Sequence, residues 1–169
     1  MKHLLLIRHA KSSWKFPELD DHDRPLNKRG QRDVLTMSEF LVDQGGSLEM
    51  IYSSSAVRAL SYSTYLSDAC STPLEINKAF YTFSAQSLML NLGMMENALK
   101  SVAVVGHNPA ITDVVNQLTG SNIVNVPTAA IASLSLELSK WQEIRSGCAK
   151  LKFLQTPKGL KGGNASGLL

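Results

Sequence analysis

Two short, uninterrupted runs of apolar residues constrain the fold of this chain more than any other feature. They are HLLLI at residues 3–7 and SVAVVG at residues 101–106. A strand that reads as a continuous apolar run, without polar residues at alternate positions, is covered on both faces. The second run is also rich in small and β-branched residues, which favour strands. Both runs therefore predict inner strands of a sheet that has helices on both sides.

Helical patterns alternate with other strand-like runs along the rest of the chain. Strands are expected at residues 48–54 and 73–77, and helices at 27–44, 56–69, 84–95 and 108–120. Near the C-terminus, residues 130–138 and 149–155 predict two strands that pair with each other. This order predicts a three-layer α/β/α sandwich with a mostly parallel central sheet and an antiparallel C-terminal strand.

The length and composition indicate one globular domain. The chain has 169 residues, of which 44% are hydrophobic. We expect a single domain at residues 1–160 and a flexible, Gly-rich tail at residues 161–169. The net charge of +3 comes without a run of Lys and Arg, so no nucleic-acid partner is expected. No apolar stretch approaches the ~20 residues that cross a membrane, so we expect a cytoplasmic protein without a membrane partner.

Side chains that can take part in catalysis or anion binding follow three of the expected strands. Arg8 and His9 end the first strand, Arg58 follows the second, and His107 and Asn108 follow the run at 101–106. Because the active site of an open α/β sheet lies at the carboxyl ends of its strands, we expect these groups to meet. The sequence therefore predicts one site that contains two imidazoles and at least two guanidiniums.

This combination of side chains suits a phosphoryl group. The guanidiniums of Arg8 and Arg58 can each bind two phosphate oxygens. A neutral His9 is a competent nucleophile if its other ring nitrogen is held by a carbonyl in the turn after the strand. His107 would donate to the phosphoryl oxygens.

Further candidates for phosphate or substrate binding are Ser12, Arg24 and Asn108. For Ser12 a place in a solvated loop is an equal alternative, and Arg24 either contacts the substrate or braces its loop. The two cysteines have no zinc-ligand spacing, and the acidic residues do not cluster at strand ends, so no metal is expected.

The same residues carry a family resemblance. LLLIRHAKSSW at residues 4–14 resembles the RHG signature of the histidine phosphatase superfamily. Five later segments resemble, in order, the landmarks of its short SixA-like branch, the phosphohistidine phosphatases: DRPLNKRG, IYSSSAVRA, VVGHNP, NVPTAAIASL and LQTPKGL. The resemblance implies a phosphoglycerate mutase-like fold, no cofactor, and a phosphohistidine on a signalling or phosphotransfer protein as substrate. It implies His9 as the nucleophile that forms a phosphohistidine intermediate, with Arg8, Arg58 and His107 around the phosphoryl group.

The sequence departs from the superfamily where a proton donor is expected. One branch has a Glu after the third strand, but this chain has AFYTFSAQ at residues 79–86, without a carboxylate. Another branch has an Asp after the second His, where Asn108 stands here. Weak candidates remain in the first loop, namely Glu18, Asp20, Asp21 and Asp23. Because a protonated imidazole leaves phosphorus readily, whereas an alkoxide needs an acid worth about 10²–10⁴ in rate, the sequence favours N–P over O–P substrates.

Three functions remain open at this point. The first is a metal-independent phosphatase that acts on phosphohistidine in a protein. The second is a phosphatase or mutase for small phosphate esters. The third is a non-catalytic module that binds phosphorylated partners.

Overall fold

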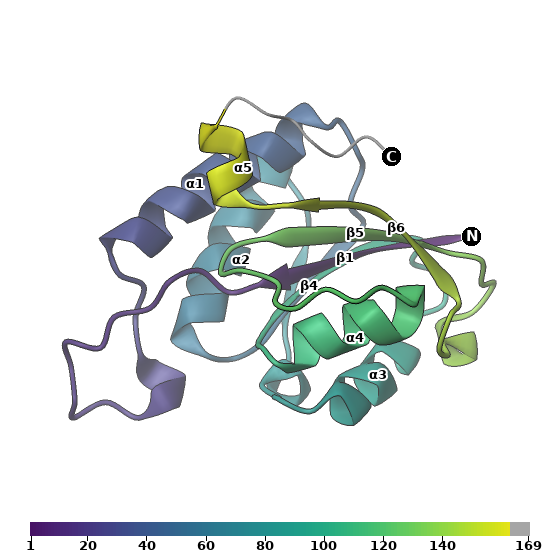
Figure 1. The fold of residues 1–169 in the computed structure, drawn as a ribbon, viewed down its shortest axis with the longest axis horizontal. Coiled ribbons are helices and arrows are strands. Elements are labelled where there is room, and N and C mark those ends of the chain that lie inside the picture. Colours follow the sequence, from purple (N-terminus) through teal and green to yellow (C-terminus); the bar gives the residue numbers. More distant parts are fainter. Residues whose placement is uncertain (163–169) are drawn as a thin grey trace.

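A computed structural model describes residues 1–162 of the chain (Figure 1). The strands are β1 (Lys2–Arg8), β2 (Met50–Ser53), β3 (Leu74–Ile76), β4 (Ser101–Gly106), β5 (Ile131–Leu136) and β6 (Ala149–Gln155). The α-helices are α1 (Lys28–Asp43), α2 (Val57–Cys70), α3 (Ala85–Gly93), α4 (Ala110–Thr119) and α5 (Pro157–Lys161). Short 3₁₀ turns are η1 (Asp21–Asp23), η2 (Lys78–Phe80) and η3 (Trp141–Glu143).

The strands form one mixed sheet in the order β3-β2-β4-β1-β5-β6. The first four strands of the chain are parallel to one another, which confirms the mostly parallel sheet. β5 is antiparallel to β1, and β6 is antiparallel to β5. The strand that reverses direction is therefore the penultimate one, and the C-terminal strand again runs in the direction of β1.

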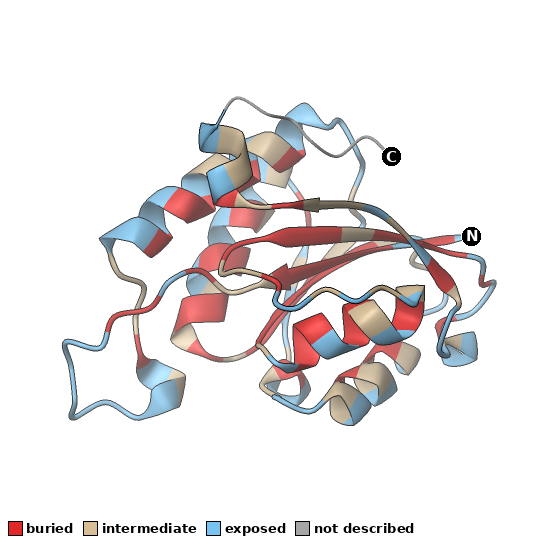
Figure 2. Cartoon of the chain, in the orientation of Figure 1, coloured by how far each residue is buried: buried red, intermediate tan, exposed pale blue. Residues whose placement is uncertain are grey.

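Helices cover both faces of the sheet, as expected for a three-layer sandwich (Figure 1). Alternate residues of β1 point to opposite faces. Leu4 and Leu6 pack with the apolar side chains of α3 and α4, whereas Leu5 and Ile7 pack with those of α1 and α2. The inner strands are accordingly the most continuously buried part of the ribbon in Figure 2.

The end of the domain differs slightly from the prediction. Residues 157–161 form α5, which was not expected from the sequence, so the predicted boundary at residue 160 falls inside this helix. Most of the expected flexible tail, residues 163–169, lies outside the described residues. No helix among residues 1–162 is long and apolar enough to cross a membrane. The cytoplasmic location stays a prediction.

The loop between β1 and α1 is closed at its base by backbone hydrogen bonds. The amide of Ser13 donates to the carbonyl of Pro25 at 2.8 Å, and the amide of Asn27 donates to the carbonyl of Lys11 at 2.9 Å. Asn27 also caps α1, because its side chain accepts from the amide of Gly30. These contacts hold the loop beside the carboxyl end of β1, at the lower left of Figure 1.

Gly30 permits this close approach of α1 to the loop. A Cβ atom at this position would lie 2.1 Å from the carbonyl oxygen of Lys11, which is backbone and cannot rotate away. We therefore expect Gly30→Ala to lower the free energy of unfolding by about 3 kcal/mol, as overpacking does. Urea unfolding measures this loss. Gly46→Ala is the control, since a Cβ there meets nothing within 4 Å. Equal stability of the two variants would contradict the prediction.

Candidate active site

The register of the parallel strands brings His9 and His107 together. Arg8 of β1 pairs with Gly106 of β4, so the residues that follow them emerge side by side. The amide of His9 donates to the carbonyl of Gly106 at 3.0 Å. The two imidazole rings lie with their centroids 5.1 Å apart. Two residues distant in the sequence thus share one site, as the sequence predicted.

The tautomer of His9 follows from its hydrogen bond. Its Nδ1 atom lies 2.7 Å from the carbonyl oxygen of Ala10, the next residue in the turn. A carbonyl oxygen only accepts, so Nδ1 carries the proton and donates it. The lone pair is therefore on Nε2. The expectation that a carbonyl in the turn after the strand holds one nitrogen of His9 is confirmed.

His107 is buried beneath the site and is held by two groups. Its Nε2 atom lies 2.7 Å from the hydroxyl oxygen of Ser54, and its Nδ1 atom lies 3.4 Å from an Nη atom of Arg58. The hydroxyl of Ser54 can donate or accept, whereas the guanidinium of Arg58 can only donate. The contact with Arg58 makes Nδ1 the acceptor and places the proton of His107 on Nε2, which donates to the hydroxyl oxygen of Ser54.

Arg8 and Arg58 each present an unsatisfied donor. Arg8 donates from Nη1 to the carbonyl of Val126 at 2.9 Å, and Arg58 uses its Nη atoms on Asp21. The Nε atoms of both guanidiniums are buried and have no hydrogen-bond partner among the described residues. Buried donors without a partner cost free energy, and an anion between these groups would satisfy them.

The loop after β1 contributes a carboxylate to the site. Asp21 accepts hydrogen bonds on Oδ2 from Arg58 at 2.8 Å and from the hydroxyl of Tyr81 at 2.7 Å. Its other oxygen accepts from Arg24 at 3.0 Å. Burial raises the pKa of this carboxyl, but the hydrogen bonds from Tyr81 and Arg58 lower it by more. The resulting pKa is well below the usual range. Asp21 is therefore ionised at neutral pH and is a poor proton donor.

Ser12 and Arg24 lie together in the wall of the site. Arg24 donates to the hydroxyl of Ser12 and, from Nε, to the carbonyl of Ser13 at 3.3 Å. Its guanidinium also lies 3.3 Å from the centroid of the Trp14 ring. Arg24 thus braces the loop, and it also lines the cavity described below.

Asn108 is the sequence candidate that the structure does not bring to the anion site. Its amide nitrogen donates to Asn125 and to the carbonyl of Val126, and its oxygen accepts from the amide and hydroxyl of Thr112. All its hydrogen-bonding groups are used in joining α4 to the segment that carries Val126. Because Val126 in turn accepts from Arg8, Asn108 acts on the site indirectly, and its assignment as a phosphate ligand needs correction.

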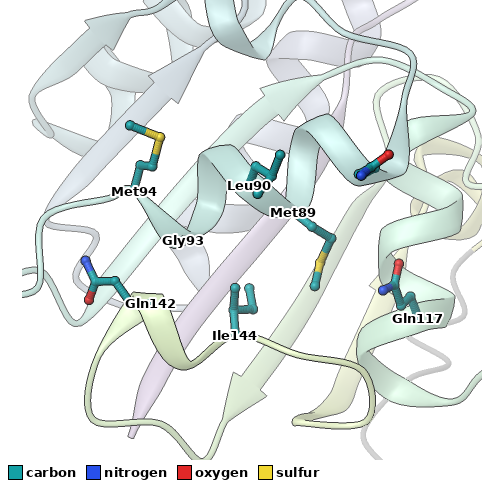
Figure 3. Close-up of a pocket in the computed structure, with 8 residues that line it drawn as sticks. Met89, Leu90, Gly93, Met94, Gln117, Gln142 and Ile144 are labelled. Atoms are coloured by element: carbon teal, nitrogen blue, oxygen red, sulfur yellow. The ribbon is translucent and has the colours of Figure 1, made fainter.

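These groups surround a cavity of about 250 Å³. Its lining comprises Arg8, His9, Lys11, Ser12, Trp14, Asp21, Arg24, Arg58, Phe83 and Thr128. A second cavity of about 480 Å³ lies between α3 and η3 (Figure 3). It is lined by Met89, Leu90, Met94 and Ile144 together with glutamines and a glycine, none of which is a nucleophile or ionises near neutral pH. The cavity of about 250 Å³ is the candidate active site because His9 and the guanidiniums of Arg8 and Arg58 line it.

The site keeps both imidazoles neutral. Burial, followed by the positive charges of Arg58, Arg8 and Arg24, lowers the pKa of His9 to about 4. Burial, followed by His9 and Arg58, lowers the pKa of His107 to about 3. Both values lie below the ordinary value of 6.5. At neutral pH His9 therefore has the free lone pair that a nucleophile requires.

These shifts predict how stability changes with pH. Between the folded pKa of about 4 and the ordinary value of 6.5, the unfolded chain binds protons that folded His9 does not. The free energy of unfolding therefore rises with pH across this window and falls as the solution is acidified. Urea unfolding at several pH values measures the slope. His9→Ala should reduce it, and an unchanged slope in that variant would contradict the prediction.

Several site residues were not found from the sequence. Ser54, Tyr81 and Phe83 were not assigned a role in the site, and Asp21 was only one of four loop carboxylates. His22 contacts Ser55 at 3.0 Å and the ring of Tyr81 at a centroid distance of 5.0 Å, so it lies in the outer wall of the site. Their only sequence signal was nearness to strand ends or to Arg24, which many loop residues share.

Within residues 1–162, no three His, Cys, Asp or Glu side chains are grouped as metal ligands would be. The chain is thus an α/β protein with a sheet covered on both faces. Its paired imidazoles and free guanidinium donors form a candidate site for an anion. The histidine phosphatase superfamily (branch 1) model matches residues 4–86 of the chain, which include most of β1, His9 and Arg58. The match covers just under half of the chain and supports its assignment to this superfamily of phosphatases.

Individual proteins extend the similarity over the whole domain. An uncharacterized protein of Mycobacterium leprae is 27% identical over 164 residues, which cover 90% of this chain and 100% of that protein. A structure of the protein histidine phosphatase SixA complexed with tungstate has a TM-score of 0.79 at 21% identity and covers 94% of this chain and 99% of that one. A mycobacterial glucosyl-3-phosphoglycerate phosphatase, in a complex with VO3, has a TM-score of 0.68 at 14% identity, covering 89% and 97%. The fold is therefore the phosphoglycerate mutase-like, SixA-like one.

Proposed function

We propose that this protein is a metal-independent phosphatase that removes the phosphoryl group from a phosphohistidine carried by another protein. The observation that carries the proposal is the state of His9. Its Nδ1–H is held by Ala10, which leaves the Nε2 lone pair beside two buried guanidinium donors that have no partner among the described residues. A candidate nucleophile and the guanidiniums that can bind a phosphoryl group thus line one cavity.

In the first step, the Nε2 lone pair of His9 forms a bond to phosphorus while the N–P bond of the substrate breaks. The electron pair of that bond stays on the departing imidazole nitrogen. If the substrate ring is already protonated on its other nitrogen, it leaves as a neutral imidazole and needs no further proton. Arg8 and Arg58 stabilise the negative charge on the phosphoryl oxygens. His107 accepts from Arg58 on Nδ1 and so orients that guanidinium.

In the second step, water attacks the phosphorus of the phosphorylated His9. The P–Nε2 bond breaks, inorganic phosphate is released, and the proton of water passes to phosphate or solvent. His9 regains its lone pair on Nε2, and the bond of Nδ1 to Ala10 keeps the ring in place throughout. The enzyme returns to its starting state without a metal ion or other cofactor.

The preference for an N–P bond rests on Asp21. Among the described residues that line the cavity, Asp21 is the one with a carboxylate side chain. Hydrogen bonds hold its pKa far below the usual range. An ionised carboxylate cannot protonate a leaving alkoxide, which costs such substrates about 10²–10⁴ in rate. A phosphohistidine is not affected, because its ring leaves without that help. The similarity in fold to a protein histidine phosphatase supports the same choice.

The second candidate is a phosphatase for small phosphate esters. The similarity in fold to a glucosyl-3-phosphoglycerate phosphatase favours it, as does a cavity of only about 250 Å³. Such an enzyme would need a proton donor for the leaving alkoxide, and the carboxyl of Asp21 in the cavity lining is ionised.

A substrate panel in the presence of EDTA tests the proposal. Its members are a protein phosphorylated on histidine by phosphoramidate, free phosphohistidine, 3-phosphoglycerate and glycerol phosphate. We expect kcat/KM for the two N–P substrates to exceed that for the esters by at least about 10²-fold, with no loss in EDTA. A strong preference for an ester would favour the second candidate. Tight tungstate binding without turnover of any substrate would support a binding module and end the proposal.

A further inference from the structure

Two aromatic side chains lie at the mouth of the catalytic cavity and have no role in the steps above. Phe83 lines the cavity although 47% of it is exposed, and its ring centroid is 5.4 Å from that of His107. Trp14 also lines the cavity and is 76% exposed, although Arg24 covers one face of its ring. Large apolar side chains left this exposed beside a polar site often mark a binding surface.

Phe83 is held in place even though it is half exposed. Its ring packs edge-on against Tyr81, at a centroid distance of 5.5 Å, and the hydroxyl of Tyr81 donates to Asp21. Asp21 is in turn bonded to Arg58. The ring is thus fixed relative to the guanidinium that faces the phosphoryl group. A preorganised contact of this kind adds affinity, because little conformational freedom is lost on binding.

We propose that Phe83, with Trp14, forms a subsite for a flat ring in the leaving group, and that it makes the enzyme specific for ring-bearing phosphoryl compounds. The proposal rests on the proposed function, since it places the phosphoryl group at His9. In-line displacement requires the leaving group to depart on the side opposite Nε2. A substrate whose phosphoryl group lies among the guanidiniums extends toward the mouth, where these two rings lie.

The chemistry of this mouth suits a ring better than a chain of hydroxyl groups. Aromatic rings pair with one another by offset or edge-on packing, at centroid distances of about 4.5–7 Å. A phosphorylated imidazole, or another planar ring, would make such a contact with Phe83. A glycerol or ammonia leaving group has no ring to place there. The contact is therefore expected to discriminate between leaving groups that carry the same phosphoryl group.

Two non-hydrolysable phosphonates test the subsite by calorimetric binding. Phenylphosphonate and methylphosphonate carry the same anionic group, and only the first carries a ring. At a pH where both are dianions, we expect phenylphosphonate to bind about tenfold more tightly. Phe83→Ala should remove that difference and change methylphosphonate affinity by less than about twofold. Retained methylphosphonate binding also shows that the variant is folded and that its anion site is intact.

Phe16→Ala is the matched control, because Phe16 is 45% exposed and belongs to the same loop as Trp14 but does not line the cavity. It should leave the affinity of both phosphonates unchanged. Phe83→Leu, which keeps apolar bulk but loses the ring, should retain only part of the preference. Equal affinity for the two phosphonates in the unchanged protein would overturn the proposal. So would an equal loss of both ligands in Phe83→Ala, which would indicate a structural role.

A kinetic comparison links the subsite to catalysis. Free phosphohistidine and phosphoramidate both have an N–P bond, but only the first has a ring. In Phe83→Ala, kcat/KM should fall about tenfold for phosphohistidine and less than about twofold for phosphoramidate. The two proposals fail in different ways. If the enzyme hydrolyses neither compound, the proposed function fails while the phosphonate preference still reports on the subsite. If it hydrolyses both with equal loss in the variant, only the subsite is wrong.

Discussion

Replacing His9 by alanine is expected to abolish the covalent phosphoryl-enzyme and to lower kcat by about 10⁵-fold or more, as loss of a nucleophile does. In the structure, His9 is the ring whose Nδ1 proton is held by a carbonyl, so its Nε2 is free to attack. The measurement is incubation with a radioactively labelled phosphoryl donor, followed by acid and alkali. A phosphohistidine label is lost in acid and survives in alkali.

The controls separate the loss of the nucleophile from damage to the site. His22→Ala removes another imidazole from the outer wall and should keep the label, because His22 contacts Ser55 and Asp23 and does not line the cavity. In His9→Ala, tungstate should still bind, since the guanidiniums remain. Full labelling of His9→Ala would remove the basis of the mechanism.

The second large effect is expected for Arg58→Ala, with a fall in kcat/KM of about 10³-fold. Arg58 is 2% exposed and presents a buried Nε donor without a partner among the described residues. Losing one preorganised donor to a developing anion costs about 10²–10³ in rate, and an arginine at a phosphoryl group costs more. The measurement is steady-state kinetics together with the dissociation constant of tungstate, which should also rise.

Two variants identify the cause of that loss. Arg58→Lys keeps the charge but cannot form the same forked contact, so it should recover no more than about tenfold. Arg58→Ala also frees the negative charge of Asp21 near the phosphoryl group. The double variant Arg58→Ala with Asp21→Asn should therefore be more active than Arg58→Ala alone. Activity of Arg58→Ala within tenfold of the unchanged protein would show that Arg58 does not bind the phosphoryl group.

The regular elements were largely predictable because they depend on local patterns. The run at 101–106 became β4 with the expected bounds, and residues 149–155 became β6. The helix expected at residues 27–44 became α1, and Asn27 caps it because a side-chain acceptor at that position satisfies a free amide of the first turn. By contrast, α5 was missed because its sequence, PKGLK, contains a glycine and lies in a Gly-rich segment.

The site was predictable in part, and for a physical reason. Arg8, His9, Arg58 and His107 follow strands whose carboxyl ends must lie on the same edge of a parallel sheet. Asp21 was not distinguishable from its acidic neighbours, because the contact with Arg58 depends on how the loop folds back. The predicted role of Asn108 was wrong because an amide beside His107 can serve either to bind the phosphoryl group or to brace the surrounding backbone. Only its contacts with Thr112 and Val126 show the bracing role.

The sequence by itself determined where the strands end and which chemical groups stand at those ends, because apolar runs and helix caps are local signals. Only the tertiary structure decided which strand ends are neighbours. The pairing of β1 with β4, and of β2 with β4, is a long-range choice made by burial on both faces of the sheet. That pairing brought the ring centroids of His9 and His107 to 5.1 Å from each other. It also placed the hydroxyl of Ser54 within hydrogen-bond distance of His107. The folding of the first loop then set Asp21 between Arg58 and Tyr81, which local sequence patterns do not specify.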